Sequence, residues 1–189
     1  MDTIFILTIL VVFFALAFDF INGFHDTANA IATSVSTRAL KPKVAVYMAA
    51  IMNFVGALTF TGVAKTITKD IVDPFTLQNG SLIILAALLS AIIWNLVTWY
   101  FGIPSSSSHT LIGSIAGAAI AAAGFGVLNY DGFTNILIAL VVSPFLALAV
   151  GFLMMSLFKV IFKRGSLYGT NKRFRIFQIG TAALQSFTH

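Results

Sequence analysis

Polar and ionisable side chains gather between residues 19 and 34, inside a run of otherwise apolar residues that begins at residue 4. The group contains two carboxylates and a histidine among amides and hydroxyls: Asp19, Asn22, His25, Asp26, Thr27, Asn29, Thr33 and Ser34. An ionisable group inside a hydrophobic span is costly and usually faces a bundle interior, a charged partner or a water-filled cavity. The stretch therefore predicts an ion or substrate site.

Helical spacing sharpens this prediction. In a helix with about 3.6 residues per turn, residues three or four apart share one face. Four polar residues follow this spacing: Asn22, Asp26, Asn29 and Thr33. Their carboxylate, amide and hydroxyl oxygens suit a small hard cation or a proton. The alternative is that they form hydrogen bonds between helices, which is a common use of Asn and Thr in membranes.

The composition excludes several classes of protein. The chain of 189 residues is 59% hydrophobic and 9% charged, and its mean hydropathy is +0.98. This apolar content predicts an all-α integral membrane protein embedded in the lipid bilayer. The absence of cysteine excludes disulfides and thiolate chemistry. The net charge of +5 comes from short basic clusters between apolar runs, which favour membrane anchoring over binding to nucleic acid.

Apolar runs predict about five transmembrane helices, a broken serine-rich helix and the start of a sixth. The expected spans are 4–37, 44–64, 81–101, 109–127 and 133–158. Basic residues without acids occur at 38–43 and in an expected loop at 159–175. Because Lys and Arg concentrate in cytoplasmic loops, we expect a multi-pass protein of the plasma membrane with its N-terminus outside.

A second polar segment, residues 102–113, contains four consecutive serines and no Lys, Arg, Asp or Glu. Pro104 ends the incoming helix, and the serines can cap the next one. A helix N-terminus aimed into the membrane would present free amides and partial positive charge, and could bind an oxyanion without a basic side chain. A flexible serine loop is the simpler alternative.

The two segments resemble motifs of the inorganic phosphate transporter (PiT) family of secondary transporters, of the bacterial low-affinity permease type. Gly-Phe-His-Asp-Thr-Ala-Asn-Ala at 23–30, with Thr-Arg-Ala-Leu at 37–40, is similar to the amino-terminal motif of the family. Pro-Ser-Ser-Ser-Ser-His-Thr-Leu-Ile-Gly at 104–113 is similar to its serine-rich motif. The resemblance implies one repeat of an inverted-repeat fold at 1–175 and a truncated start of the second half at 176–189. Alone, the chain would then supply half of a site.

The resemblance also implies roles for single residues. Phosphate would contact the second motif through Ser105, Ser106, Ser107, Ser108 and Thr110. The coupled proton or cation would be held by the first motif through Asp19, Asn22, His25, Asp26, Asn29 and Thr33. His25 replaces the asparagine of many sodium-coupled members and looks like the branch associated with proton coupling, which histidine can support because it titrates near neutral pH. A sodium site would instead use Asp26 and Asn29.

The predicted function is inorganic phosphate transport by cation-coupled symport, with a proton as the expected ion and alternating access as the mechanism. The expected partners are phosphate, free or as a metal-phosphate complex, the lipid bilayer and a second copy of the chain as a homodimer. We expect no cofactor, no nucleic acid and no metal site other than the sodium site named above. Sodium coupling, and sulfate or another oxyanion as substrate, stay open.

An intramembrane serine hydrolase is the alternative outside transport. It would use Ser105 or Ser108 with His109 or His25. A hydrolase also needs an orienting third group and an oxyanion hole. The chain has no Gly-x-Ser-x-Gly elbow, the motif that exposes such a nucleophile in α/β-hydrolases. We therefore do not expect an enzyme.

Overall fold

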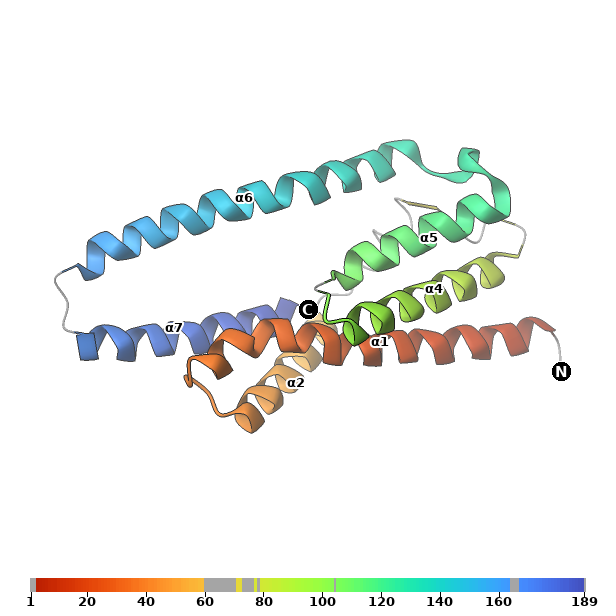
Figure 1. The fold of residues 1–189 in the computed structure, drawn as a ribbon. Coiled ribbons are helices and arrows are strands. Elements are labelled where there is room, and N and C mark those ends of the chain that lie inside the picture. The colour runs from red at the N-terminus through yellow and green to blue at the C-terminus, as the bar shows by residue number, and fades with distance from the viewer. Residues whose placement is uncertain are drawn as a thin grey trace.

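The computed structural model describes residues 3–59, 71–72, 77, 79–103, 105–163 and 167–188, and its regular elements there are all helical (Figure 1). The elements are α1 (Thr3–Ser36), α2 (Pro42–Thr59), α4 (Gly80–Tyr100), α5 (Ser107–Ala123), the short 3-10 helix η2 (Phe125–Val127), α6 (Tyr130–Phe162) and α7 (Leu167–Thr188). The prediction of an all-α membrane protein is confirmed.

Four of these helices, α1, α2, α4 and α6, are long and apolar enough to cross a membrane. None of the residues of α6, all of which the structure describes, is buried, and its exposed side chains are largely apolar. Apolar side chains on the outside of a backbone-satisfied helix suit contact with lipid. α5 is also apolar but has 17 residues, so the span expected at 109–127 is shorter than predicted and ends at Gly124, whose φ is +79°.

α1 is the element on which the others pack. α4 contacts its N-terminal half, with α5 lying on α4, and α2 and α7 contact its C-terminal half (Figure 1). On the first side, Phe18 and Ile21 of α1 pack with Leu88, Ala91 and Ile92 of α4. Because lipid is as apolar as these side chains, van der Waals packing stabilises such a contact inside a membrane, not removal of the side chains from water. Because α4 contacts both α1 and α5, it positions α5 near the polar residues 19–34 of α1.

Small residues build the second side. Ala30 of α1 packs with Ala45 and Ala49 of α2, and small side chains let membrane helices approach closely. Gly56 of α2 lies directly against the backbone carbonyl of Phe187 in α7. α7 therefore belongs to the packed unit.

The prediction of a basic loop over 159–175 is wrong. α6 continues to Phe162 and α7 already begins at Leu167, so Lys172 and Arg175 lie on a helix. Lys and Arg are good helix formers. The positive charge of this segment bears on which side of the membrane it lies, and it does not specify whether the backbone is helix or loop. Residues 60–64 of the second expected span lie outside the described residues.

Candidate functional site

The break between α4 and α5 places the serine row at the start of a helix. Gly102 has a φ of +64°, a left-handed conformation that glycine adopts without strain. Ser106 is the N-cap of α5, and its hydroxyl accepts a hydrogen bond from the His109 amide at 3.4 Å. Thr110 donates from its hydroxyl to the Ser106 carbonyl at 3.0 Å. The predicted serine cap is therefore confirmed; Pro104 lies outside the described residues.

The first turn of α5 meets the polar stretch of α1 at Asp26. The hydroxyl of Ser107 donates a hydrogen bond to Oδ2 of Asp26 at 2.5 Å, and both side chains are buried. Hydrogen bonds to ionised acceptors are shorter and stronger than neutral ones. This bond joins the two motifs across 81 residues of sequence.

His25 completes a buried row of three groups. Its Nδ1 lies 3.4 Å from Oδ1 of Asp26, and the histidine is 9% exposed. The carboxylate thus stands between the serine and the histidine, whereas a serine hydrolase needs the histidine between the serine and the carboxylate. Ser105, one of the nucleophiles considered, instead accepts a hydrogen bond from Nε1 of Trp94 at 3.3 Å. Ser105 and His109 line the same cavity, but among the described residues no hydrogen bond joins Ser105 or Ser108 to either histidine. The geometry therefore does not support the hydrolase alternative.

Two of the predicted phosphate contacts also line a cavity of about 370 Å³ between α4 and α5. Ser105 and Thr110 form part of its wall, together with Ser90 and Ser114. Ser108 is exposed at the same end of α5. The serine row is therefore divided, since Ser107 faces α1 while its neighbours face a cavity, the helix end or the outside.

Asn95 of α4 is a buried polar residue that our sequence reasoning did not place in the site. It is 0% exposed, and neither its Oδ1 nor its Nδ2 has a hydrogen-bond partner among the described residues. Oδ1 of Asn22 on α1 also lacks one. Buried polar groups are nearly always hydrogen-bonded, so each exception calls for an explanation such as an ion, a water or a functional role. The signal in the sequence was an amide inside an apolar span.

The two amides lie at the same level of the bundle. α1 and α4 run in the same direction (Figure 1). Ile21, directly before Asn22, and Ile92, three residues before Asn95, belong to one packed cluster. Phe24 and Trp99, which follow the two amides, have ring centroids 5.6 Å apart. Asn22 precedes the His25–Asp26 pair by about one turn of α1, and Asn95 lies at the corresponding level of α4.

The remaining candidates on α1 stay predictions. Asp19, Asn29 and Thr33 are exposed. The helical face shared by Asn22, Asp26, Asn29 and Thr33 is covered by α4 and α5 only over its first half. Within the described part of the chain, no group of three or more His, Asp or Glu side chains could hold a metal ion; a cation site would depend on amide and hydroxyl oxygens.

Comparison with known proteins decides the family. Residues 22–169, which contain both motifs, match the phosphate transporter family. The chain belongs to this family. It is 71% identical over all 189 residues to a probable low-affinity inorganic phosphate transporter of Bacillus subtilis, of which it covers 57%. It is 48% identical to one of Mycobacterium leprae, with 97% of this chain and 44% of that protein covered.

The fold of this phosphate transporter family member is also found in a solved structure. A chain described as the sodium-dependent phosphate transporter superposes with a TM-score of 0.75 at 25% identity, covering 96% of our chain and 53% of that one. The chain spans about half the length of the Bacillus and Mycobacterium relatives and of this structure. These relatives are named as transporters.

Proposed function

We propose that this chain is part of a membrane transporter of inorganic phosphate in which Asp26 couples the anion to a proton or cation. The observation that carries the proposal is the hydrogen bond from Ser107 in the first turn of α5 to the buried carboxylate of Asp26. It brings the first turn of α5, our proposed anion site, into direct contact with Asp26, our proposed site for the proton or cation.

The chemistry of the two groups explains why they would act together. The first turn of α5 leaves backbone N–H groups without intrahelical acceptors, and its positive end favours an oxyanion. A charged Asp26 repels that oxyanion; two like charges 4 Å apart cost about 4 kcal/mol at an effective dielectric constant near 20. A proton or cation on Asp26 removes this repulsion. Binding of each partner therefore favours binding of the other.

In this mechanism the hydroxyl of Ser107 exchanges one hydrogen-bond acceptor, Asp26, for another, a phosphate oxygen. It has a single proton to donate, and in this structure the proton points at Asp26. Once Asp26 is protonated or holds a cation, its oxygens need this donor less, and Ser107 can turn to a phosphate oxygen. We propose that this exchange precedes the alternating movement of the helices.

We propose a proton as the coupling ion. His25 lies 3.4 Å from Asp26, and histidine changes charge near neutral pH. Sodium is the second candidate: a similar solved structure is described as sodium-dependent, and the partnerless oxygens of Asn22 and Asn95 suit a hard cation. Sulfate is less favoured than phosphate, because it carries no proton near neutral pH to donate to a carboxylate.

The setting in the membrane is part of the same proposal. The basic residues of the α1–α2 turn and of α7 support an N-terminus on the outer side of the plasma membrane. An inverted repeat, a homodimer and a metal-phosphate substrate remain proposals that rest on the family resemblance.

The test is uptake of labelled phosphate by the full-length protein in proteoliposomes, with inward proton and sodium gradients imposed separately. Asp26→Asn keeps the side-chain volume and removes the charge, and we expect it to lower uptake at least tenfold, equivalent to about 1.4 kcal/mol. Asp131→Asn, which changes an exposed carboxylate at the start of α6, is the control. Unchanged uptake and pH dependence in Asp26→Asn would refute the mechanism, and competition by excess sulfate tests the choice of anion.

A further inference from the structure

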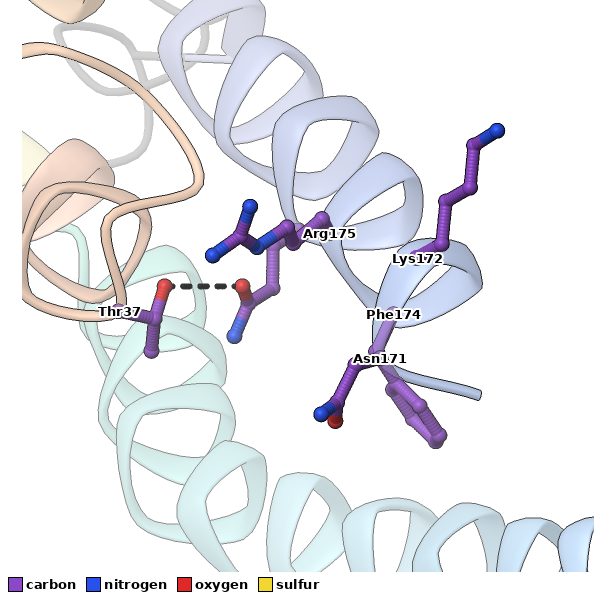
Figure 2. Close-up of a pocket in the computed structure, with 6 residues that line it drawn as sticks. Thr37, Asn171, Lys172, Phe174 and Arg175 are labelled. Carbon is purple, nitrogen blue, oxygen red and sulfur yellow. Dashed lines mark hydrogen bonds between the residues drawn. The ribbon is translucent and has the colours of Figure 1, made fainter. Parts of the chain in front are cut away.

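A separate cavity lies where the C-terminal end of α1 meets the first turns of α7 (Figure 2). Its volume is about 630 Å³. The residues that line it are mostly polar or basic: Thr37, Asn171, Lys172, Phe174, Arg175 and Gln178. Thr37 is eleven residues beyond Asp26 on α1, or about 16 Å along the helix axis, so this cavity is distinct from the Asp26–Ser107 site.

The cavity carries positive charge without a described counter-ion. Lys172 and Arg175 both line it. The acids that the structure describes are Asp19, Asp26 and Asp131; the first two lie well back along α1, and the third lies at the far end of α6 (Figure 1). In Figure 2 Arg175 extends toward Thr37, whereas Lys172 extends away from it on the same helix. An anion beside the Arg175 guanidinium would offset this uncompensated positive charge.

Neutral donors are held in place beside these cations. The hydroxyl of Thr37 lies 2.9 Å from Oε1 of Gln178 (Figure 2) and 2.7 Å from the Thr33 carbonyl. The Gln178 carbonyl accepts a hydrogen bond from the buried Ser34 at 3.0 Å. These contacts hold Gln178 at the cavity wall, where its side-chain amide has N–H groups to offer. In Figure 2 Arg175 extends toward Thr37, and Asn171 lies on the same side of α7.

One wall of the cavity is apolar. Phe174 lines it and belongs to an aromatic cluster between α6 and α7, with ring centroids 5.7 Å from Phe158 and 5.2 Å from Phe162. The apolar surface continues from the cavity onto α6, whose residues are largely exposed. A basic, hydrogen-bonding pocket with an apolar wall fits a phosphate group attached to a hydrocarbon chain.

We propose that this cavity binds a phosphate group, carried by an anionic phospholipid or supplied as free inorganic phosphate. The planar guanidinium of Arg175 suits two phosphate oxygens at once, and Lys172 adds a second charge. Basic clusters beside membrane-spanning helices attract anionic lipid headgroups by about 1 kcal/mol per Lys or Arg. The Phe174 wall favours the lipid source. The proposal does not depend on the transport mechanism.

The experiment measures ligand-dependent thermal stability of the full-length protein in detergent. One arm adds phosphatidylglycerol against phosphatidylcholine, and the other adds inorganic phosphate with phosphatidylcholine alone. The test variant is Lys172→Gln/Arg175→Gln. The matched control is Lys41→Gln/Lys43→Gln, which removes the same charge from exposed residues at the start of α2 that do not line the cavity.

We expect the test variant to need about tenfold or more phosphatidylglycerol for half of the stabilisation, in line with the loss of two such charges, and the control to need little more than the wild type. Phosphate protection that is present in the wild type and lost in the test variant would identify free phosphate as the ligand. Protection by phosphate that survives in the test variant belongs to another site. Identical dependence on both ligands in all three proteins would overturn the proposal.

Two further variants keep the result decisive. Arg175→Lys keeps the charge but loses the planar fork, so it should fold and show a smaller, measurable loss of affinity. Asp26→Asn leaves the cavity unchanged and should keep the wild-type response to phosphatidylglycerol whatever happens to its uptake. Failure of the transport proposal and failure of this one are therefore distinguishable.

Discussion

The hydroxyl of Ser107 donates a hydrogen bond to the carboxylate of Asp26 at 2.5 Å. This bond connects the first turn of α5 to the C-terminal half of α1. Both residues are buried, and they come from the two motifs that were the strongest signals in the sequence. In the proposed mechanism, an anion at the start of α5 and a proton or cation on Asp26 act through this one hydroxyl.

Ser107→Ala removes this donor from a buried carboxylate. Such a loss costs about 1–3 kcal/mol, so we expect a lower melting temperature together with strongly reduced phosphate uptake. Ser108→Ala, at an exposed position one residue further along, should leave the melting temperature nearly unchanged. Equal melting temperatures for the two variants would show that the Ser107–Asp26 bond does not stabilise the protein.

His25→Gln tests whether the histidine takes part in proton coupling. Histidine is a common proton carrier, and His25 lies 3.4 Å from Asp26. Uptake that uses a proton on this histidine should therefore increase toward acidic external pH in the wild type, and the increase should be flattened in the variant. The measurement is initial uptake rate against external pH at a constant gradient. A variant whose profile follows that of the wild type would favour sodium at the Asp26 site.

Gly56→Ala tests the close approach of α2 and α7. A Cβ at this position would collide with the backbone carbonyl of Phe187, and the helices would have to separate. Overpacking of this kind costs about 1–3 kcal/mol, which thermal unfolding in detergent would detect. Gly151→Ala is the control, because a Cβ there meets no atom within 4 Å; helix propensity predicts that it is neutral or slightly stabilising. Equal stability of the two variants would contradict the packing of α7 against α2.

Asn95→Leu separates stability from function. The buried amide of Asn95 lacks a described partner, and burying such a group costs about 1–3 kcal/mol. Leucine of similar size should therefore keep or raise the melting temperature. If Asn95 serves the site, phosphate uptake should fall although the protein is stable. Asn135→Leu at an exposed position on α6 is the control, and full uptake by Asn95→Leu would assign this amide to packing alone.

The class of protein and the residue types of its candidate site follow from the amino-acid sequence. Apolar content identified a membrane protein, and a carboxylate in an apolar span indicated a candidate ion site, since both follow from the cost of placing charge in hydrocarbon. The serine cap of α5 was also predictable, because capping depends on neighbouring residues.

Which of these residues meet depends on how the helices pack. Spacing placed Asp26, Asn29 and Thr33 on one helical face, but the end of α5 covers only the part of that face at Asp26, so the other two are exposed. Asn95 is an amide inside an apolar span of the sequence, and in the bundle, where α4 packs on both α1 and α5, it is fully buried. The Ser107–Asp26 contact joins residues 81 positions apart. It depends on how whole helices pack, which the local periodicity of a sequence does not specify.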